Sequence, residues 1–179
     1  MTPDKIFIKK LLDSAHDSSI LKIFSKGDYI IREGQVEQSF YVIETGAVRV
    51  FHVTEFEEQT IRFGYEGSII TSLSSFITGK PSEFYIEALR KTTLRIIPKH
   101  HLSQVANQDM ESMVQYNKLL EALIVQQIER EIDLLTESPT KRLQRVLERS
   151  PNLFQEIPLK YIASYLRMTP ETLSRIRNS

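Results

Sequence analysis

The sequence predicts an α+β protein in which an N-terminal β-roll, similar to a jelly roll, precedes a long helix and two short C-terminal helices. Three observations predict this arrangement. Residues 20–98 consist of short runs rich in Ile, Val, Phe and Tyr, separated by Gly and polar turns, which is typical of strands. Residues 110–135 carry apolar side chains three or four positions apart, which indicates a helix. Residues 158–177 hold two shorter helical patterns on either side of a turn.

The β-roll is expected to contain about eight short strands. Their predicted ranges are 20–24, 29–31, 40–44, 47–53, 59–63, 68–70, 84–88 and 93–97. Turns such as Glu33-Gly34 and Gly79-Lys80-Pro81 separate them. This number and spacing favours a jelly roll or small barrel, which leaves few strand edges open. A short helix over residues 3–17 is expected to precede the strands, with an apolar face formed by Ile6, Ile8, Leu11 and Leu12.

The long helix has an apolar seam of nearly heptad spacing over about twenty-five residues. Such a helix is too long to be covered by one small barrel, so its seam packs on its own body or on the same helix of a second chain. A parallel homodimer is the favoured interpretation. The expected dimer interface consists of Met113, Asn117, Leu120, Ile124, Gln127 and Ile128.

The composition fits a globular protein with three parts. The chain has 179 residues, of which 41% are hydrophobic and 26% charged. We expect a β-roll sensor domain at 1–108, a dimerisation helix at 109–136 and a C-terminal domain at 137–179. The sequence holds no run of eighteen apolar residues and does not start like a secretory signal, so a cytoplasmic location without membrane contact is expected. Cysteine is absent, which excludes disulfides, thiolate-held iron–sulfur clusters and thiolate zinc sites.

The histidines give no support for a metal site or for catalysis. His16, His52, His100 and His101 show no metal-ligand spacing, and adjacent residues point in different directions on a helix or strand. A cupin-like enzyme is an alternative because the β-roll resembles that architecture, but the metal set of cupins is not indicated, since His52 has no second histidine in an HxH pattern. We therefore expect no catalytic residues, no metal and no cofactor, although an unidentified small-molecule effector is compatible with the fold.

Charge is distributed unevenly along a chain whose formal net charge is zero. Residues 139–179 contain eight basic and three acidic residues, so this segment carries 8 − 3 = +5 and the remainder −5. A basic module on an acidic body is typical of a protein that binds the phosphate backbone of nucleic acid. The alternative is a solvated helix face without a ligand.

The two C-terminal helical patterns predict a helix-turn-helix. Thr169 can cap the second helix, Pro170 suits its first position and Glu171 favours its positive end. Glu171 and Arg175 are four residues apart and share one face, from which a carboxylate can accept from cytosine and a guanidinium can donate to guanine in the major groove. The alternative is a surface ion pair between them, worth only ~0.3–0.5 kcal/mol. The expected DNA contacts are Lys160, Arg167, Thr169, Pro170, Glu171, Thr172, Ser174, Arg175 and Arg177.

Two separated motifs resemble one known family. Gly-Asp-Tyr-Ile-Ile-Arg-Glu-Gly at 27–34, Phe-Tyr-Val-Ile at 40–43 and Gly-Ala-Val-Arg-Val at 46–50 resemble the early signatures of cyclic-nucleotide-binding domains. Pro-Glu-Thr-Leu-Ser-Arg-Ile at 170–176 resembles a recognition helix. In this order, and over nearly the whole chain, they resemble the Crp/Fnr family of bacterial regulators. The resemblance implies a homodimer that regulates transcription on a palindromic double-stranded DNA site, with a TTGA-like half-site and RNA polymerase as a further partner.

The sequence departs from this family at the ligand site and at its end. Ser72 stands at the ribose-binding Glu position, and Ser82, followed by Glu83, stands where the phosphate-binding Arg is expected. Without that guanidinium we expect no tight binding of cyclic AMP. The β-roll either holds another small ligand or is filled by its own side chains; the candidate pocket residues are Gly67, Thr71, Ser72, Ser74 and Ser82. The helix-turn-helix is expected to lack a wing, and without cysteine no oxygen-sensing cluster is expected.

The sequence is also consistent with a second class of function, a binding module. A chain with a short C-terminal module is also consistent with a sensor that binds a small molecule or a protein and whose DNA binding is weak or lost.

Overall fold

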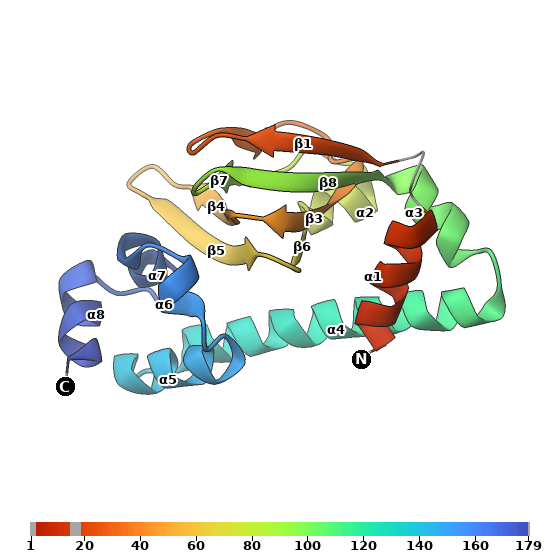
Figure 1. Cartoon of the computed structure of the whole chain (residues 1–179). Helices are drawn as coiled ribbons and strands as arrows, with labels where there is room; N and C mark the ends of the chain where they lie inside the picture. Colours follow the sequence, from red (N-terminus) through yellow and green to blue (C-terminus); the bar gives the residue numbers. More distant parts are fainter. Residues whose placement is uncertain (1–2, 15–18, 179) are drawn as a thin grey trace.

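The computed structural model describes residues 3–14 and 19–178, and its elements follow the predicted order (Figure 1). The predicted N-terminal helix is present from Pro3 to Ser14, while residues 15–17 of that prediction, and His16 with them, lie outside the described residues. The elements are α1 Pro3–Ser14, β1 Ile20–Phe24, β2 Tyr29–Ile31, β3 Ser39–Thr45, β4 Ala47–Val53, β5 Glu58–Tyr65, β6 Ile69–Ile70, α2 Leu73–Thr78, β7 Tyr85–Ala88, β8 Thr92–Pro98, α3 Lys99–Ala106, α4 Met110–Leu135, α5 Pro139–Arg149, α6 Leu153–Glu156, α7 Leu159–Tyr165 and α8 Pro170–Arg177.

The eight strands form two four-stranded sheets, which confirms the predicted β-roll. One sheet has the order β1-β8-β3-β6 and the other β2-β7-β4-β5, and every pairing between neighbours is antiparallel. Their facing sides enclose an apolar core that includes Phe24, Ile43, Val50, Ile86 and Leu94. Because successive side chains of a strand point to opposite faces, each strand places every second apolar residue in this core.

Two further apolar clusters attach the helices to the β-roll. Phe7 and Leu11 of α1 and Leu119 of α4 pack with Phe40 and Ile97 on the outer face of the first sheet. A separate cluster holds the helices after α4 together and includes Leu143, Ile162 and Leu173. That cluster also takes in Ala47 and Leu89 of the β-roll. The C-terminal helices therefore share a core with the β-roll.

Strand β4 shows how closely the C-terminal helices are attached. Its residues Ala47 to Phe51 are all buried, instead of alternating between buried and exposed. One face of the strand points into the β-roll, and on the other face the guanidinium carbon of Arg49 lies 4.3 Å from the ring centroid of Tyr161 in α7. A strand covered on both faces has no solvent side on which polar residues would alternate.

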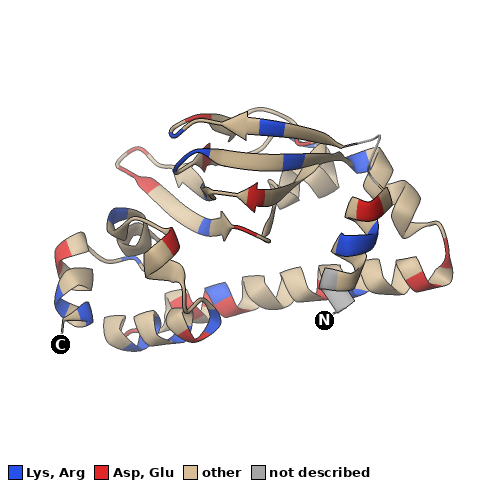
Figure 2. Cartoon of the chain, viewed as in Figure 1, with Lys and Arg blue, Asp and Glu red and all other residues tan. Residues whose placement is uncertain are grey.

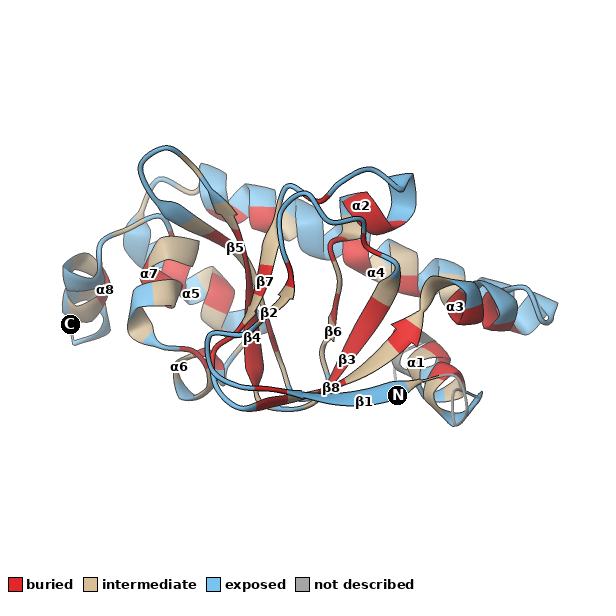
Figure 3. Cartoon of the chain, turned by 90° about the horizontal axis from the view of Figure 1, so that it is seen from above, coloured by how far each residue is buried: buried red, intermediate tan, exposed pale blue. Residues whose placement is uncertain are grey.

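Helix α4 runs beneath the whole length of the β-roll, from the end near α1 to the end near α5 (Figure 1). Asp109 caps its N-terminus by accepting a hydrogen bond from the Ser112 backbone N–H at 2.7 Å. Leu119 and Leu123 are buried against the chain's own body. Buried and exposed residues alternate along the helix (Figure 3), so it has an inner and an outer face.

Three short helices were not predicted from the sequence. These are α2, α3 and α6, and α2 follows directly after the candidate pocket residues Thr71 and Ser72. With four to eight residues each, they are too short for hydrophobic periodicity to indicate them. None of the helices in the described part of the chain is both long enough and apolar enough to span a membrane.

We predict that Gly46→Ala destabilises the β-roll far more than Gly34→Ala. Both glycines have positive φ, +100° and +84°, so both substitutions carry the cost of a left-handed backbone, about 1–2 kcal/mol. At Gly46 a Cβ would also lie 2.4 Å from the Thr92 Oγ1 and 2.6 Å from its Cα, whereas at Gly34 nothing lies within 4 Å. Urea denaturation should therefore show a loss for Gly46→Ala that exceeds that for Gly34→Ala by roughly 2 kcal/mol or more; equal losses would contradict the crowded packing.

Candidate nucleic-acid interface and ligand cavity

Helices α7 and α8 and the turn between them form a compact helix-turn-helix. Ile162 and Ala163 of α7, Leu166 of the turn and Leu173 of α8 are all fully buried. Ala163 has only a methyl group, which allows α8 to cross α7 closely. The Thr169 hydroxyl accepts a hydrogen bond from the Thr172 backbone N–H at 3.2 Å and so caps α8 as its sequence predicts.

Arg167 gives the turn its sharp reversal. Its φ of +54° is the one positive value among the non-glycine residues that the structure describes. The Met168 backbone N–H donates to the Ala163 carbonyl at 3.1 Å, and the Arg142 guanidinium of α5 donates to the carbonyl of Leu166 at 2.5 Å. These contacts hold the left-handed residue in place.

The outer face of α8 presents polar and charged groups. Pro170, Glu171 and Arg175 are exposed, while Thr172 and Ser174 are half-buried. Hydrogen bonds from its own backbone N–H and from the Thr169 hydroxyl lower the pKa of the Glu171 carboxyl, which is therefore ionised near neutral pH. No ion pair joins Glu171 to Arg175 among the bridges found in the described residues, so both groups are available to a ligand.

Only some of the eight basic side chains in residues 139–179 are exposed and free of ion pairs. Arg142 donates to the carbonyls of Thr136 and Leu166, and Arg145 and Arg149 pair with carboxylates of α4. Five of the eight basic residues remain exposed without such pairing. These are Lys141, Lys160, Arg167, Arg175 and Arg177. They lie on α5, α7, the turn and α8, at one end of the molecule (Figure 2).

The β-roll positions the helix-turn-helix through direct contacts with α7. The Thr60 backbone N–H donates to the Ser164 hydroxyl at 3.0 Å, and that hydroxyl donates to the Glu58 carbonyl at 3.2 Å. Arg49, buried beneath Tyr161, pairs with Glu58 at 2.5 Å and with Glu87 at 2.6 Å. The β4–β5 turn is acidic (Figure 2), so α8 begins beside a negatively charged hairpin.

A cavity of about 680 Å³ lies between the β-roll and α4. Of the predicted pocket residues, Thr71, Ser72 and Ser74 line it, whereas Gly67 and Ser82 do not. Its wall is mostly apolar, with side chains that include Val50, Ile61, Leu73, Ile77, Phe84, Leu123 and Ile128. Such a cavity suits a ligand with an apolar body and few polar groups.

Ser82 and Ser72 form a closed hydrogen-bonded pair instead of an anion site. Their hydroxyl oxygens are 2.7 Å apart, and the Ser82 hydroxyl is also within hydrogen-bond distance of the backbone N–H and carbonyl of Phe84. Both side chains are almost completely buried. A hydroxyl engaged in this way offers a phosphate neither positive charge nor a free donor.

The outer face of α4 is apolar and uncovered. Ile124 and Ile128 are 60% and 49% exposed, and they continue a stripe of exposed apolar residues. The stripe consists of Met110, Met113, Val114, Ile124, Val125, Ile128, Ile132 and Leu135. Of the other predicted interface residues, Asn117 and Gln127 are exposed and Leu120 is half-buried.

The sequence did not predict several residues that line these cavities or hold the helices together. Arg62 of β5 and Arg130 of α4 line the cavity between the β-roll and α4, and Asp133 is a fully buried carboxylate that anchors α5. The spacing of charged residues along one helix gives no signal for pairing between helices. Within the described residues, no group of three or more His, Asp or Glu is placed to hold a metal ion.

The comparisons with known proteins agree with this architecture. The family model described as "Cyclic nucleotide-binding domain" matches residues 21–109. Residues 21–109, which hold all the strands after β1 begins and helix α3, are thus similar to this domain family. No curated protein matches the sequence significantly.

Solved structures extend the likeness beyond the cyclic nucleotide-binding domain. FixK2 from Bradyrhizobium japonicum superposes with a TM-score of 0.76 at 20% identity, over 89% of this chain and 83% of that one. A putative transcriptional regulator of the Crp/Fnr family from Eubacterium rectale gives 0.66 at 20% identity, over 95% and 80%. A CRP-family transcriptional regulator from Thermus thermophilus gives 0.65 at 18%, over 88% and 82%. The predicted fold is thereby confirmed: a cyclic nucleotide-binding domain, a long helix and C-terminal helices arranged as in Crp/Fnr regulators. The second and third of these structures are named as transcriptional regulators.

Proposed function

We propose that this chain is a cytoplasmic, sequence-specific DNA-binding transcription regulator of the Crp/Fnr type that acts as a homodimer. The observation that carries this proposal is the outer face of α8. It presents an ionised Glu171 in the first turn and an Arg175 without an ion pair in the last turn of a short helix that belongs to a compact helix-turn-helix. An α-helix with such groups fits the major groove, where it can contact base edges.

The apolar stripe of α4 supports a twofold assembly. Exposed apolar residues that follow one helix face over its whole length are typical of a helix that packs against a partner. Pairing two copies along α4 would bring two α8 helices to one side of the assembly. Two recognition helices that enter successive major grooves must lie about 34 Å apart, so the preferred site should be a palindrome with half-sites one duplex turn apart.

We further propose that cyclic AMP is not the effector. The buried Ser72–Ser82 pair replaces the charged clamp that a cyclic phosphate needs, and the adjoining cavity wall is largely apolar. The alternative function, a sensor with weak or lost DNA binding, draws support from the acidic β4–β5 turn beside α8, because its carboxylates repel phosphates.

Selection of operators from random duplexes tests the proposed function directly. We expect enrichment of a palindrome with a TTGA-like half-site, and we expect cyclic AMP to change neither the selected sequence nor the amount of DNA retained. Retention of DNA without enrichment of any sequence, or no retention at low salt, would favour the sensor without specific DNA binding.

Arg175→Ala should weaken binding to the selected operator by roughly 1–3 kcal/mol and relax the base preference at one position of each half-site. Lys160→Ala is the matched control, because an exposed lysine at the start of α7 is placed for a phosphate. It should weaken operator and scrambled DNA equally and reduce the salt dependence by about one phosphate contact. Gel-shift titrations on both duplexes measure this; an equal loss on both for Arg175→Ala would rule out base contact.

Ile124→Glu should convert the homodimer to a monomer, because two like charges would be buried in the apolar seam. We expect the dimer dissociation constant to rise at least a hundredfold. Gln126→Glu adds the same charge two residues away, where the exposed side chain lines the cavity beside the chain's own C-terminal helices, and should leave the dimer intact. Sedimentation velocity of the three proteins distinguishes these results; a wild-type monomer at micromolar concentration would refute the dimer.

A further inference from the structure

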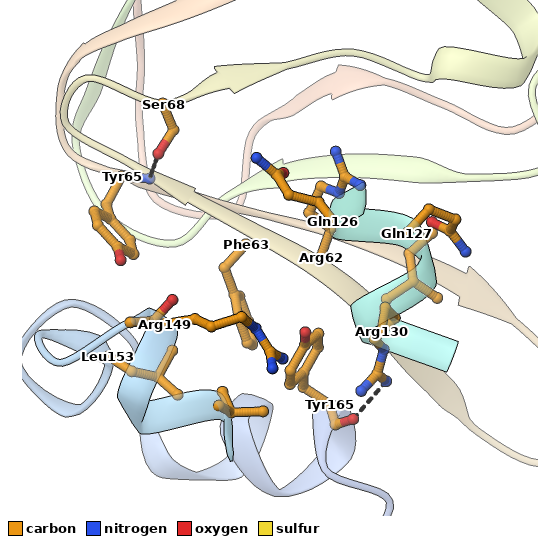
Figure 4. A pocket seen from close by; sticks show the side chains of 13 residues that line it. Arg62, Phe63, Tyr65, Ser68, Gln126, Gln127, Arg130, Arg149, Leu153 and Tyr165 are labelled. Atoms are coloured by element: carbon orange, nitrogen blue, oxygen red, sulfur yellow. Dashed lines mark hydrogen bonds between the residues drawn. The ribbon is translucent and has the colours of Figure 1, made fainter. Parts of the chain in front are cut away.

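A second cavity, of about 360 Å³, lies at the junction of the cyclic nucleotide-binding domain and the helix-turn-helix (Figure 4). It is enclosed by β5, the C-terminal half of α4, the segment from α5 to α6, and the end of α7. It adjoins the larger cavity, with which it shares Ile61 and Arg62 of β5 and Gln127 and Arg130 of α4, and it lies away from the outer face of α8. The proposed DNA contacts do not account for its polar groups.

Arg130 of α4 is the most unusual group in this cavity. The residue is only 7% exposed, and its Nη2 donates to the Tyr165 carbonyl at 2.5 Å. Its guanidinium carbon lies 3.7 Å from the ring centroid of the same tyrosine, which fixes the plane of the group. The Nη1 atom is buried and has no hydrogen-bond partner in the described chain. A buried, charged donor without an acceptor is unfavourable unless a ligand supplies one.

Arg62 of β5 adds a second uncompensated charge to the cavity wall. It is half-buried and appears in none of the ion pairs of the described residues, and burial lowers its pKa. Burial also lowers the pKa of Arg130, and the positive charge of Arg167 lowers it further. Arg149, in contrast, lines the same cavity but is neutralised by Asp133 and Glu129. An arginine keeps its charge at any physiological pH. Within the described residues neither Arg62 nor Arg130 forms an ion pair, and the Asp133 carboxylate that attracts Arg130 is already paired with Arg145 and Arg149.

The rest of the wall sets the size and chemistry of a ligand. Gln126 and Gln127 bring amide groups, and Ile61, Phe63 and Leu153 bring apolar surface. We propose that this cavity is a binding site for a small metabolite with an oxyanion group, a phosphate or a carboxylate, held by Arg130 and Arg62. Arg130 donates a hydrogen bond to the oxyanion from its free Nη1. Arg62, on strand β5, faces the same cavity and contributes a second positive charge. The remainder of the ligand lies against the apolar part of the wall.

Such a ligand would connect three parts of the chain. Arg62 belongs to β5, Arg130 to α4, and Tyr165 to the first helix of the helix-turn-helix. Neutralising Arg62 and Arg130 together stabilises the junction in the arrangement described here. The bound anion therefore acts on the orientation of the helix-turn-helix from the junction itself.

Thermal unfolding and calorimetric titration of the full-length protein test this site with inorganic phosphate and with citrate, against chloride at equal ionic strength. A hundredfold excess of ligand over its dissociation constant should raise the unfolding midpoint by roughly 5–10 °C. A response to phosphate alone assigns the site to phosphate compounds, and a response to citrate alone assigns it to carboxylates. Absence of a response to both anions overturns the proposal.

Arg62→Gln and Arg130→Gln should each weaken anion binding at least tenfold. Arg62→Gln removes a charge that has no partner in the described chain, so in chloride its unfolding midpoint should equal or exceed that of the wild type. Lys91→Gln, at an exposed turn far from the cavity, removes the same charge and should respond to the anion as the wild type does. An unchanged response in Arg62→Gln and Arg130→Gln, or the same loss in Lys91→Gln, would show that the anion acts through general screening. None of these readouts depends on DNA, so the site can fail while the proposed function stands.

Discussion

The buried carboxylate of Asp133 determines where the C-terminal helices lie. It is fully buried on the inner side of α4, and it accepts charge-assisted hydrogen bonds from Arg145 and Arg149 of α5. Removing either arginine leaves part of a buried charge uncompensated, which is far less favourable than losing a surface pair. Arg142, one turn earlier on α5, satisfies the Thr136 carbonyl at the end of α4 and the Leu166 carbonyl in the turn before α8. Helix α5 thereby connects the end of α4 to the turn of the helix-turn-helix, and α8 follows the position of α4.

Helix α4 has two faces that differ in burial, and in the proposed homodimer each face would make its own contacts. Leu119 and Leu123 are buried in the chain's own body, while Ile124 and Ile128, one position further around the helix, are exposed. The larger cavity is lined by the buried Leu123 and also by the exposed Ile124 and Ile128, so its ligand and a second chain would both contact this part of α4. A small rotation of α4 therefore alters both contacts. Since α5 is anchored to α4 by the Asp133 pairs, the same rotation would move α8.

The sequence was sufficient to predict the fold because each element carries a strong local signal. The strands are bounded by glycine turns, α4 has a long periodic pattern, and α8 begins with Thr169-Pro170-Glu171. Charge counting was less informative: of the eight basic residues that indicated a nucleic-acid surface, Arg142, Arg145 and Arg149 have internal partners up to 25 positions away in the sequence. The Arg62–Arg130 cavity had no signal at all, since its wall is assembled from β5, α4 and α7 and exists only after they pack.

The Ser72–Ser82 pair affects how the stability of the domain depends on a ligand. A guanidinium at the position of Ser82 would be an uncompensated buried charge whenever no anion balanced it, and its domain would be degraded faster when the ligand was scarce. Here two neutral hydroxyls satisfy each other and the backbone of Phe84. On the proposal that cyclic AMP does not bind, the folded fraction of this domain, and with it the amount of protein protected from proteases, would not depend on the supply of cyclic AMP.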